Sequence, residues 1–311
     1  MEQICENRDP WLVDESSLTQ ACVLGRGSFG SVTLVGDPQL RAYAKKTCSI
    51  NLFSNLEKEL DIMLRFHNHP CIVQAKSTFV HLENNTRYCY IYMEYANKQT
   101  LHKMISEFPG KPLPEYMIQR AAGMILQGLE ALHAKGYVHC DLKPGNILLF
   151  HSTTFGEPFD LKLADFGLSK EPNSSYAHPC GSMFPGTPHY MPRESLGPNG
   201  LIDPALDIWS LGCVVYEMFG GEPEQELFEN YYEWRLFEEI SPVAKDFLRQ
   251  CHGLHPSYKG IMGLKYPIRA TASELLNHPF ITQKLSVPLP TIIRQQQEDW
   301  PMIPRLPGSI W

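Results

Sequence analysis

The residues of this chain change character about a third of the way along, and the change limits the folds that it can adopt. Between residues 18 and 95, short runs rich in β-branched and aromatic residues alternate with turn formers. From Thr100 onward, apolar residues instead recur at helical spacing. A strand-rich segment before a helix-rich one predicts an α+β fold, in which a small β-rich lobe precedes a larger helical lobe. The expected strands are residues 32–35, 41–46, 73–80 and 88–95.

Three helices are expected from the apolar periodicity. The first runs from Ser54 to Phe66 and opens with a capping box, in which Ser54 is the cap and Glu57 stands three residues on. The others are residues 115–135 and 205–219, and the last is apolar on nearly every face, so it should be buried. The expected apolar stripes are Leu56, Leu60, Met63 and Leu64 on the first helix, and Ile118, Ala122, Ile125, Leu126, Leu129 and Leu132 on the second.

Charge and cysteine content narrow the classes of function. The 311 residues carry 27 Lys and Arg against 34 Asp and Glu, a formal net charge of -7, so no basic face for nucleic acid or an anionic membrane is expected. The nine cysteines include no Cys-x-x-Cys pair, and their odd number fits a reduced compartment. No run approaches the roughly 20 apolar residues that span a bilayer. We therefore expect no membrane insertion. The expected location is the cytoplasm, with the nucleus as a second option.

A glycine-rich element lies within the strand-rich segment. Gly25-x-Gly27-x-x-Gly30 is followed by Val32 and a run that is typical of a strand. The same glycine spacing marks dinucleotide-binding folds, but there the third glycine opens a helix. Glycines let backbone amides approach phosphates, because no Cβ stands in the way. The strand context indicates a flap over a triphosphate, and a glycine-rich hairpin without a ligand is the competing interpretation.

A lysine and a helix acid are candidates for an ion pair. Alternation along the expected strand places Ala44 and Lys46 on one face and Lys45 on the other. We expect Lys46 to meet the phosphates of a nucleotide, with the small Ala44 leaving room for adenine, and Lys45 is the competing assignment. Glu59 is the expected partner of Lys46, because such a pair aligns the ammonium group on the α and β phosphates. Glu57 is the second choice.

Two short motifs farther along point to a chemistry. The run His139-Cys-Asp-Leu-Lys-Pro-Gly-Asn146 is followed nineteen residues later by Asp165-Phe-Gly167. Phosphoryl transfer needs little covalent help from a protein and rests on positioning and on neutralising charge. The motifs supply a carboxylate that can act as a base, a lysine that can contact phosphate, and hard oxygen ligands that suit magnesium.

Together, these features resemble the eukaryotic protein kinase domain. The resemblance also rests on Gly186-Thr187 and on Asp207-Ile-Trp-Ser-x-Gly212, and it covers about residues 18–281. It implies a bilobal protein kinase fold, with one lobe at residues 18–95 and the other at 96–281. Residues 1–17 would then be an N-terminal extension, and residues 282–311 a proline-rich tail that we expect to be poorly ordered.

The resemblance implies a role for each matching residue. Asp141 would orient the substrate hydroxyl and accept its proton, Lys143 would contact the γ-phosphate, and Asn146 and Asp165 would hold Mg²⁺. Met93 resembles the gatekeeper, and the hinge would follow it. The residues expected at the ATP site are Leu24, Gly25, Gly27, Gly30, Val32, Ala44, Lys46, Glu59, Met93, Glu94, Ala96 and Leu148.

Three further residues would hold the helical lobe in shape. Glu194 and Arg269 resemble a buried ion pair that ties the activation segment to this lobe, and Asp207 would brace the catalytic loop. Thr187 is expected to contact Asp141 and Lys143 for structural reasons and not as a switch.

A narrower resemblance points to plant mitogen-activated protein kinase kinase kinases. It rests on Cys between His139 and Asp141, on Gly186-Thr-Pro-x-Tyr190 and on Arg269-x-Thr-Ala272. The position of Lys143, two residues after the base, resembles that of the corresponding lysine in serine/threonine kinases. The resemblance implies an upstream kinase whose protein substrate is a downstream kinase. The alternative is a nucleotide-binding pseudokinase or scaffold, suggested by Cys140 and by Pro192-Arg193.

Cys140 stands where most protein kinases have an arginine. That arginine pairs with a phosphate on the activation segment, and a thiol cannot supply its charge. We therefore hypothesise that activity depends less on phosphorylation of the segment. The candidate phosphorylation sites are Ser169, Ser174, Ser175, Tyr176 and Ser182.

Other departures concern the substrate and the ribose. Met191-Pro-Arg-Glu194 replaces the usual Ala-Pro-Glu, Gly145 argues against arginine-directed specificity, and residues 97–100 lack the acid often found near the ribose. Residues 257–267 resemble an insertion. The run His67-Asn-His69-Pro-Cys71 contains zinc-type ligands, but the sequence has no second cluster to complete a metal site.

Overall fold

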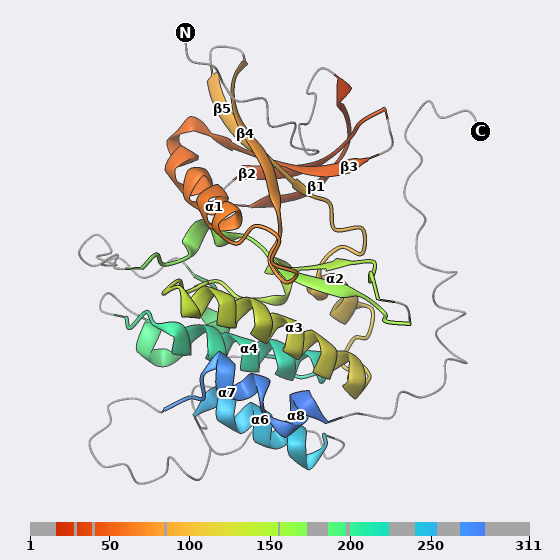
Figure 1. Ribbon diagram of the computed structural model, residues 1–311, viewed down its shortest axis with the longest axis vertical. Coiled ribbons are helices and arrows are strands. Elements are labelled where there is room, and N and C mark those ends of the chain that lie inside the picture. The colour runs from red at the N-terminus through yellow and green to blue at the C-terminus, as the bar shows by residue number, and fades with distance from the viewer. Residues whose placement is uncertain are drawn as a thin grey trace.

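The computed structural model describes residues 17–27, 30–38, 41–83, 86–154, 156–172, 186–196, 200–223, 240–253 and 268–283, without the side chains of residues 76–88. A five-stranded sheet with one helix beside it forms one end of the molecule, and a group of helices forms the other (Figure 1). This is the two-lobed α+β arrangement that the sequence predicted. Residues 1–16, 257–267 and 284–311, for which the sequence suggested an extension, an insertion and a tail, lie outside the described residues.

The sheet of the first lobe is antiparallel throughout, in the order β1-β2-β3-β5-β4. The four expected strands are present with shifted ends: β2 Gly30–Gly36, β3 Ala42–Ser49, β4 Ala75–Glu83 and β5 Thr86–Glu94. β4 begins two residues later than expected, because Ile72 and Val73 pair instead with Leu163 of the helical lobe. This pairing joins the two lobes through the backbone.

The sequence did not predict β1, Thr19–Gly27, as a separate strand. All nine of its residues are exposed, and its pairing with β2 shifts register at two places. Strand prediction from sequence rests on one face being apolar. An exposed strand with two irregularities has no such alternation, so the local pattern does not reveal it.

Helix α1, Phe53–Arg65, is the helix expected beside the sheet, but the expected cap is wrong. Ser54 lies inside the helix, and no side chain caps its first turn. The chain enters α1 directly from the 3₁₀ turn η2, Ile50–Leu52, and the amide of Phe53 donates to the carbonyl of Ile50, so the helix starts before Ser54. The expected stripe is also partly wrong, since Leu64 is 50% exposed and Ile62 is buried in its place.

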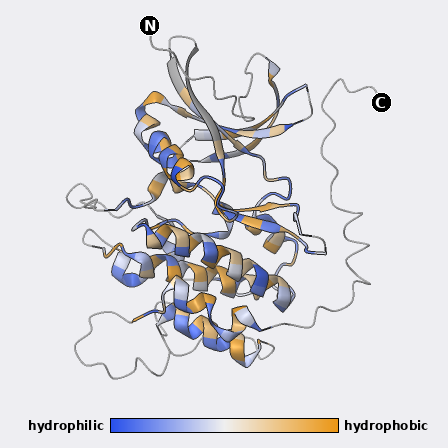
Figure 2. Ribbon diagram, in the orientation of Figure 1, coloured by the Kyte–Doolittle hydropathy of each residue, from blue (hydrophilic) through white to orange (hydrophobic). Residues whose placement is uncertain are grey.

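The second lobe is built around α3, Glu115–Ala134, and α4, Pro204–Met218, which pack against each other. All six residues of the predicted α3 stripe are fully buried, and α4 is buried along most of its length, as predicted. Figure 2 shows apolar residues along both helices, and in α4 nearly every residue is buried. The remaining helices are α2 Leu101–Ser106, α6 Pro242–His252, α7 Ala272–Leu276 and α8 Pro279–Thr282.

A small hairpin between the lobes carries the functional loops, and the sequence did not predict it. β6, Ile147–Phe150, pairs antiparallel with β7, Asp160–Leu163. The 3₁₀ turn η3, Pro144–Asn146, leads into β6, and η4, Phe166–Leu168, follows β7. Two more such turns, η5 Pro188–Tyr190 and η6 Arg193–Ser195, precede α4. The hairpin therefore presents residues 141–146 and 165–167 at the same end.

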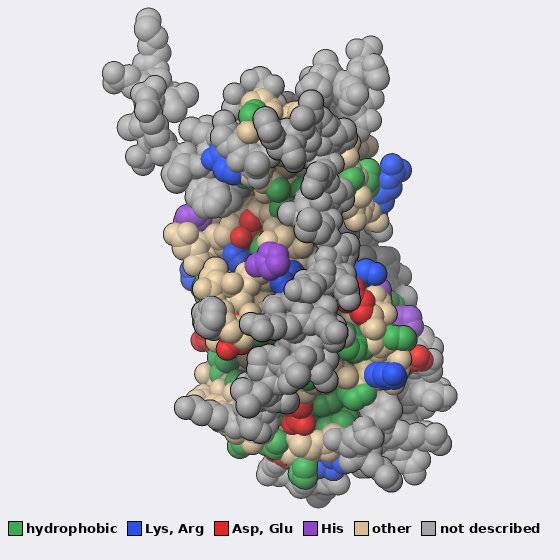
Figure 3. All heavy atoms as spheres, turned by 90° about the vertical axis from the view of Figure 1, so that its right-hand side faces the viewer, with side chains coloured by type: hydrophobic (Ala, Val, Ile, Leu, Met, Phe, Trp, Pro, Cys, Tyr) green, Lys and Arg blue, Asp and Glu red, His purple; other side chains and the backbone are tan. Residues whose placement is uncertain are grey.

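One face of the molecule carries charges of both signs among its described residues (Figure 3). Figure 3 shows the face on the right of Figure 1, where basic, acidic and apolar side chains lie interspersed. None of the helices in the described ranges is long and apolar enough to cross a membrane.

Gly212 of α4 provides a test of the packing in the helical lobe. A Cβ there would lie 2.1 Å from Cε1 of His252, which is fully buried and hydrogen-bonded to the carbonyl of Leu248. We expect Gly212→Ala to destabilise the protein by about 1–3 kcal/mol, as for other overpacked cores. The measurement is the urea midpoint followed by circular dichroism.

Gly123→Ala in α3 is the matched control. A Cβ at Gly123 would meet only Cγ2 of Ile281, at an ordinary 3.7 Å. The variant should gain helix propensity, up to about 1 kcal/mol. A shift of both variants in the same direction would contradict the packing that the structure describes.

Candidate active site

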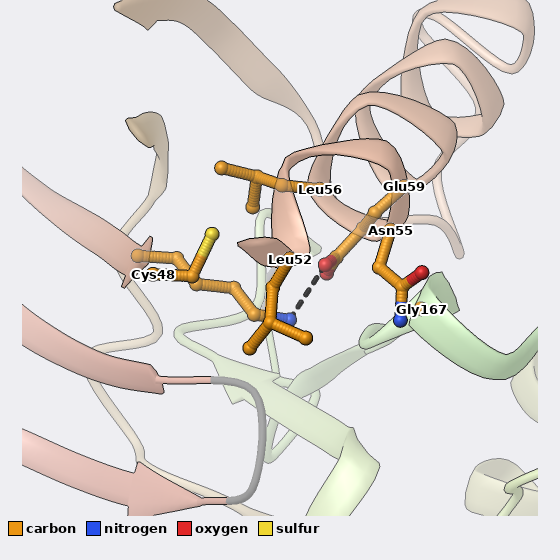
Figure 4. A pocket seen from close by; sticks show the side chains of 7 residues that line it. Cys48, Leu52, Asn55, Leu56, Glu59 and Gly167 are labelled. Atoms are coloured by element: carbon orange, nitrogen blue, oxygen red, sulfur yellow. Dashed lines mark hydrogen bonds and ion pairs between the residues drawn. The ribbon is translucent and has the colours of Figure 1, made fainter. Parts of the chain in front are cut away.

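Lys46 of β3 lies at the centre of an ion-pair cluster between the lobes. Its Nζ is 2.6 Å from Oε2 of Glu59 on α1 and 2.8 Å from Oδ1 of Asp165, which directly precedes η4. Figure 4 shows Glu59 reaching from α1 toward β3, with the dashed line marking its pair with Lys46. The pair predicted from sequence is therefore formed, and Asp165 joins it as a second carboxylate.

The three charges determine one another's ionisation. Burial alone would lower the pKa of Lys46, but the two carboxylates outweigh burial and raise it, so the ammonium group stays charged. Burial would raise the pKa of Asp165, and the Lys46 ammonium outweighs burial and lowers it. For Glu59 burial prevails, and its pKa is raised in spite of Lys46. The cluster thus presents a permanent cation beside a firmly ionised carboxylate.

The structure also decides between the paired alternatives. Ala44 and Lys46 are buried on the inner face of β3, whereas Lys45 points to the other face, where its Nζ lies 3.8 Å from the ring centre of Tyr90. On α1, Glu57 is exposed and Glu59 is buried. Lys46 and Glu59 therefore form the expected ion pair, and their roles toward a nucleotide stay predictions.

A second cluster surrounds the carboxylate of Asp141. Oδ2 accepts hydrogen bonds from Nζ of Lys143 at 2.7 Å and Nδ2 of Asn146 at 2.9 Å, and Oδ1 accepts from the hydroxyl of Thr187 at 2.7 Å. Lys143 also donates to Thr187 at 2.8 Å. The predicted structural contact of Thr187 with Asp141 and Lys143 is confirmed. Three donors thus hold the carboxylate in one orientation, and Asn146 also donates to the backbone carbonyl of Asp141.

The two clusters are joined through the backbone. The amide of Ala164 donates to the carbonyl of Asn146 at 3.0 Å, which places Asp165 next to the loop that carries Asp141. The ring of His139 lies behind this junction, where its Nε2 is 3.2 Å from the carbonyl of Ala164 and its Nδ1 accepts the amide of Asp141. Residues that are far apart in sequence are thereby fixed around one space.

Asp207 braces the catalytic loop, as predicted. From the buried first turn of α4, its carboxylate accepts the amides of His139 at 2.7 Å and Cys140 at 2.9 Å. Nε2 of His133, in the last turn of α3, lies 2.8 Å from the same carboxylate. Sequence analysis missed His133, because its partner is 74 residues away and no local motif links the two.

The predicted pair of Glu194 and Arg269 is also formed. Nη1 of Arg269 donates to Oε1 of Glu194, and both side chains are nearly fully buried. The guanidinium carbon lies 4.9 Å from the ring centre of Trp209 in α4. The pair therefore ties η6 to the core of the helical lobe.

The three glycines of the glycine-rich hairpin differ in their surroundings. Gly30 has a φ of 130°, and a Cβ there would lie 2.0 Å from the carbonyl oxygen of Thr47, so β3 itself excludes any other residue. A Cβ at Gly25 or Gly27 would meet nothing within 4 Å. These two glycines face open space, so the packing of the protein does not require glycine there. Close approach of a ligand to the backbone would explain them.

The apolar residues expected around adenine lie on both lobes. Ala44 of β3 and Met93 of β5 are buried cross-strand partners, and Ala96 is nearly buried. Val32 and Leu148 are partly buried and pack against the core, whereas Leu24 of β1 is 43% exposed. Leu148 pairs through its backbone with Thr100, which brings the helical lobe up to the connection between the lobes.

The carboxylate of Glu94 is already paired within the protein. Its Oε1 accepts the amide of Gln74 at 2.8 Å, and both carboxylate oxygens lie 2.8 Å from Nζ of Lys162 on β7. The hinge is therefore pinned to both lobes by its own acid. A ligand at this position cannot use this carboxylate, nor the amide of Glu94, which donates to the carbonyl of Gln74 at 3.1 Å. The local sequence carried no signal for Lys162.

The run from His67 to Cys71 forms a local turn. Nδ1 of His69 accepts the amide of Cys71, and the thiol of Cys71 donates to Oε1 of Gln127. Over the parts of the chain that the structure describes, no group of three or more His, Cys, Asp or Glu residues is placed to hold a metal ion by itself.

Comparison with known proteins agrees with this geometry. The family model of the protein kinase domain matches residues 18–281. The chain belongs to the protein kinase family.

Three curated relatives from Arabidopsis thaliana show where in the family its similarity lies. Mitogen-activated protein kinase kinase kinase 20 is 30% identical over 83% of this chain and 76% of its own length. Mitogen-activated protein kinase kinase kinases 5 and 1 are 30% and 32% identical over 86% and 87% of the chain, but only 37% and 42% of their own lengths. The chain thus spans about three-quarters of the first relative and less than half of the other two.

These comparisons confirm the prediction from the motifs. The protein is a serine/threonine protein kinase that is similar to plant mitogen-activated protein kinase kinase kinases. As a protein kinase it uses ATP with a divalent metal ion, and it acts on protein substrates.

The donor set of this kinase fits a hard divalent cation. The amide nitrogen of Asn146 donates to two oxygens of Asp141, so the polar atom that it has left for a cation is its carbonyl oxygen. Asp165 is ionised, and about one-third of its side chain is exposed. Its left-handed φ and ψ of 65° and 68° mean that the chain no longer follows the extended direction of β7. One carboxylate and one amide oxygen, with water in the remaining positions, are ligands that Mg²⁺ accepts.

Cys140 occupies the arginine position as a buried, neutral group. It is 1% exposed, its thiol donates to the carbonyl of Val138, and burial, the larger effect, together with Asp207, raises its pKa. Two lysines near it donate to backbone carbonyls: Lys58 to Ser169 and Lys170 to Ile202. The hydroxyl of Ser169, a candidate phosphorylation site, is itself buried and donates to His139. The other candidates, Ser174, Ser175, Tyr176 and Ser182, lie outside the described residues.

Replacing Lys46 or Lys45 by methionine tests the choice between the two lysines. We expect Lys46→Met to lower the rate of phosphoryl transfer on the order of 10²–10³-fold, the usual loss when one preorganised charge contact is removed. Glu59, whose pKa is already raised, can take up a proton, so the variant should still fold. Lys45→Met should change the rate little. The measurements are transfer from radiolabelled ATP and a thermal melt of each variant, and equal losses would contradict the assignment.

Proposed function

We propose that this protein transfers the γ-phosphate of ATP to a serine or threonine hydroxyl with Asp141 as the catalytic base. The observation that carries the proposal is the convergence of two charged clusters, joined by the hydrogen bond from Ala164 to Asn146. The convergence places a carboxylate, two ammonium groups and two candidate metal ligands around one space. Phosphoryl transfer requires this set of charges and little else from the protein.

Each residue then has a defined task. Asp141, held by Thr187, Lys143 and Asn146, orients the hydroxyl and accepts its proton as the oxygen attacks. Lys143 neutralises negative charge on the phosphoryl group during its transfer, and Lys46 binds the α and β phosphates. Mg²⁺, bound to Asn146 and Asp165, would neutralise charge on the β and γ phosphates.

The nucleotide base is proposed to lie between the lobes. Leu24 and Val32 would cover it from the β-rich lobe and Leu148 from the helical lobe, beside Ala44 and Met93. The backbone at Glu94 and Ala96 would hydrogen-bond to it, since the carboxylate of Glu94 is already paired with Lys162. The open space around Gly25 and Gly27 would admit the phosphates.

We further propose that the substrate is a downstream kinase. The support is that three of its relatives are mitogen-activated protein kinase kinase kinases, together with the motifs that resemble that group. A cytoplasmic location, with the nucleus also open to the protein, is proposed on the seven described cysteines, all of which are free thiols. A pseudokinase that binds nucleotide without transfer remains the alternative for the test to reject.

Asp141→Asn is the decisive variant for the catalytic proposal. An amide keeps the shape of the carboxylate but cannot take a proton, so phosphoryl transfer should fall at least on the order of 10²–10⁴-fold while ATP binding persists. The assay uses radiolabelled ATP with a panel of catalytically inactive downstream kinases and generic proteins.

Asp203→Asn is the control for that experiment. Asp203 caps α4 through the amide of Ala205, and asparagine caps helices as well as aspartate does. The control should retain full activity. Equal transfer by the two variants would rule out Asp141 as the base, and no transfer by the unsubstituted protein to any substrate would favour the pseudokinase.

The buried thiol of Cys140 leads to a prediction about regulation. Because no guanidinium stands at this position to pair with an activation-segment phosphate, we expect phosphatase treatment to leave most of the activity in place. The measurement is the transfer rate before and after treatment, with phosphate loss followed by mass spectrometry. Loss of activity in step with loss of phosphate would contradict this hypothesis.

A further inference from the structure

Two buried cysteines face each other on neighbouring strands behind the Lys46 cluster. Cys48 of β3 and Cys89 of β5 are directly opposed in the register of the antiparallel pair. Their sulfur atoms are 3.1 Å apart, close enough for one thiol to hydrogen-bond to the other. The residues are 4% and 1% exposed. The proposed phosphoryl transfer uses neither of them.

The backbone geometry at this pair is compatible with a disulfide. Directly opposed residues of an antiparallel pair have Cα atoms about 4.5–5.5 Å apart, within the roughly 4.4–6.8 Å that a disulfide spans. An S–S bond is about 2.05 Å long, so the sulfur atoms would have to approach by about 1 Å. Rotation of both side chains can supply part of this approach, and a shift of β3 toward β5 supplies the rest. The pair is therefore arranged to react with itself.

A small pocket gives access to Cys48 and not to Cys89. Its lining includes Cys48, Lys46, Glu59, Leu52 and Asn55, and Figure 4 shows Cys48 opposite the residues of α1. The interior of the pocket has room for about one water-sized molecule. Hydrogen peroxide is only slightly larger than water and can approach Cys48 there, whereas oxidised glutathione is far too bulky.

We propose that Cys48 and Cys89 form an oxidisable dithiol that hydrogen peroxide converts into a disulfide between β3 and β5. Cys48, the accessible thiol, attacks one oxygen of the peroxide, the O–O bond breaks, and a sulfenic acid and water result. Cys89 then attacks the sulfenic sulfur, the S–O bond breaks, and a second water leaves with the thiol proton. Two electrons pass from the two sulfurs to one peroxide, so the step is balanced.

The surroundings make the reaction slow and its product persistent. Burial, with Cys89 as a second cause, raises the pKa of Cys48 to about 12, so little of the reactive thiolate is present at neutral pH. Oxidation therefore requires an excess of peroxide. Once formed, the disulfide is screened from bulky reductants by the same small pocket. The pair is suited to register sustained oxidation and not brief exposure.

The disulfide would act on the active site through β3. Cys48 lies two residues from Lys46 on the same face of the strand, and both line the pocket under α1. Drawing Cys48 toward β5 displaces the strand that holds the Lys46 ammonium between Glu59 and Asp165. A displacement of about 1 Å can lower the rate on the order of 100-fold. This consequence, unlike the disulfide itself, rests on the proposed kinase mechanism.

Peptide mapping of the unsubstituted full chain tests the disulfide directly. The folded protein is exposed to hydrogen peroxide, quenched, alkylated in denaturant, digested without reductant and analysed by mass spectrometry. We expect a linked pair of peptides that contain Cys48 and Cys89, which dithiothreitol separates. Exposed Cys22 serves as the internal marker of oxidation. Recovery of both Cys48 and Cys89 as alkylated thiols when Cys22 is fully oxidised would overturn the proposal, as would a sulfinic acid on Cys48 without a link.

Three serine variants and an activity measurement complete the test. Cys48→Ser and Cys89→Ser should each abolish the link, whereas Cys71→Ser, at another buried cysteine, should not. Oxidised protein should lose tenfold to a hundredfold of its transfer rate and recover it with dithiothreitol. A link without loss of rate would overturn the effect on Lys46 and leave the disulfide standing. A reduced protein without any transfer would contradict the proposed function, and the mapping would still decide the disulfide.

Discussion

The buried ammonium group of Lys46 is the constraint on which the arrangement of the lobes depends. A charge removed from water costs several kcal/mol unless it is paired, and the partners of Lys46 come from two other parts of the chain. Glu59 is on α1 and Asp165 precedes η4, so strand, helix and turn must meet for the charge to be satisfied. α1 has no side-chain cap of its own, which makes its place depend on packing and on this pair.

The helical lobe uses buried charge in the same way to hold backbone in place. The carboxylate of Asp207 takes two successive amides of the catalytic loop and the ring of His133, and Glu194 pairs with Arg269. The segments that these groups hold, the catalytic loop and η6, have little regular structure of their own. Where helices and strands do not satisfy the backbone, a buried side chain does so, and the loop becomes as rigid as an element.

Two of the four residues other than glycine that have a positive φ in the described ranges lie at the same places. Cys140 and Asp165 have φ values of 69° and 65°, in the left-handed region that residues other than glycine rarely adopt. Such residues cost about 1–3 kcal/mol each and persist only where the surroundings enforce them. Asp207 enforces the first through the amides of His139 and Cys140, and the Lys46 pair restrains the second. Strain and buried charge thus coincide at the two motifs that carry the proposed chemistry.

The sequence by itself determined the α+β class, the helices around α3 and α4, and the residue types of the site. These follow from local periodicity and from motifs whose members lie within a few residues of one another. The alternation in β3 also assigned Lys46 and Lys45 to opposite faces.

The exposed strand β1, the hairpin of β6 and β7 and the start of α1 were missed or misplaced, because each depends on pairing or on a neighbouring turn. Only the tertiary structure decided that Asp165 would join Lys46, that Lys162 would engage Glu94, that His133 would meet Asp207 and that Cys48 would face Cys89. Such contacts join residues that are tens of residues apart, and no short-range pattern records which buried charge or thiol will find which partner.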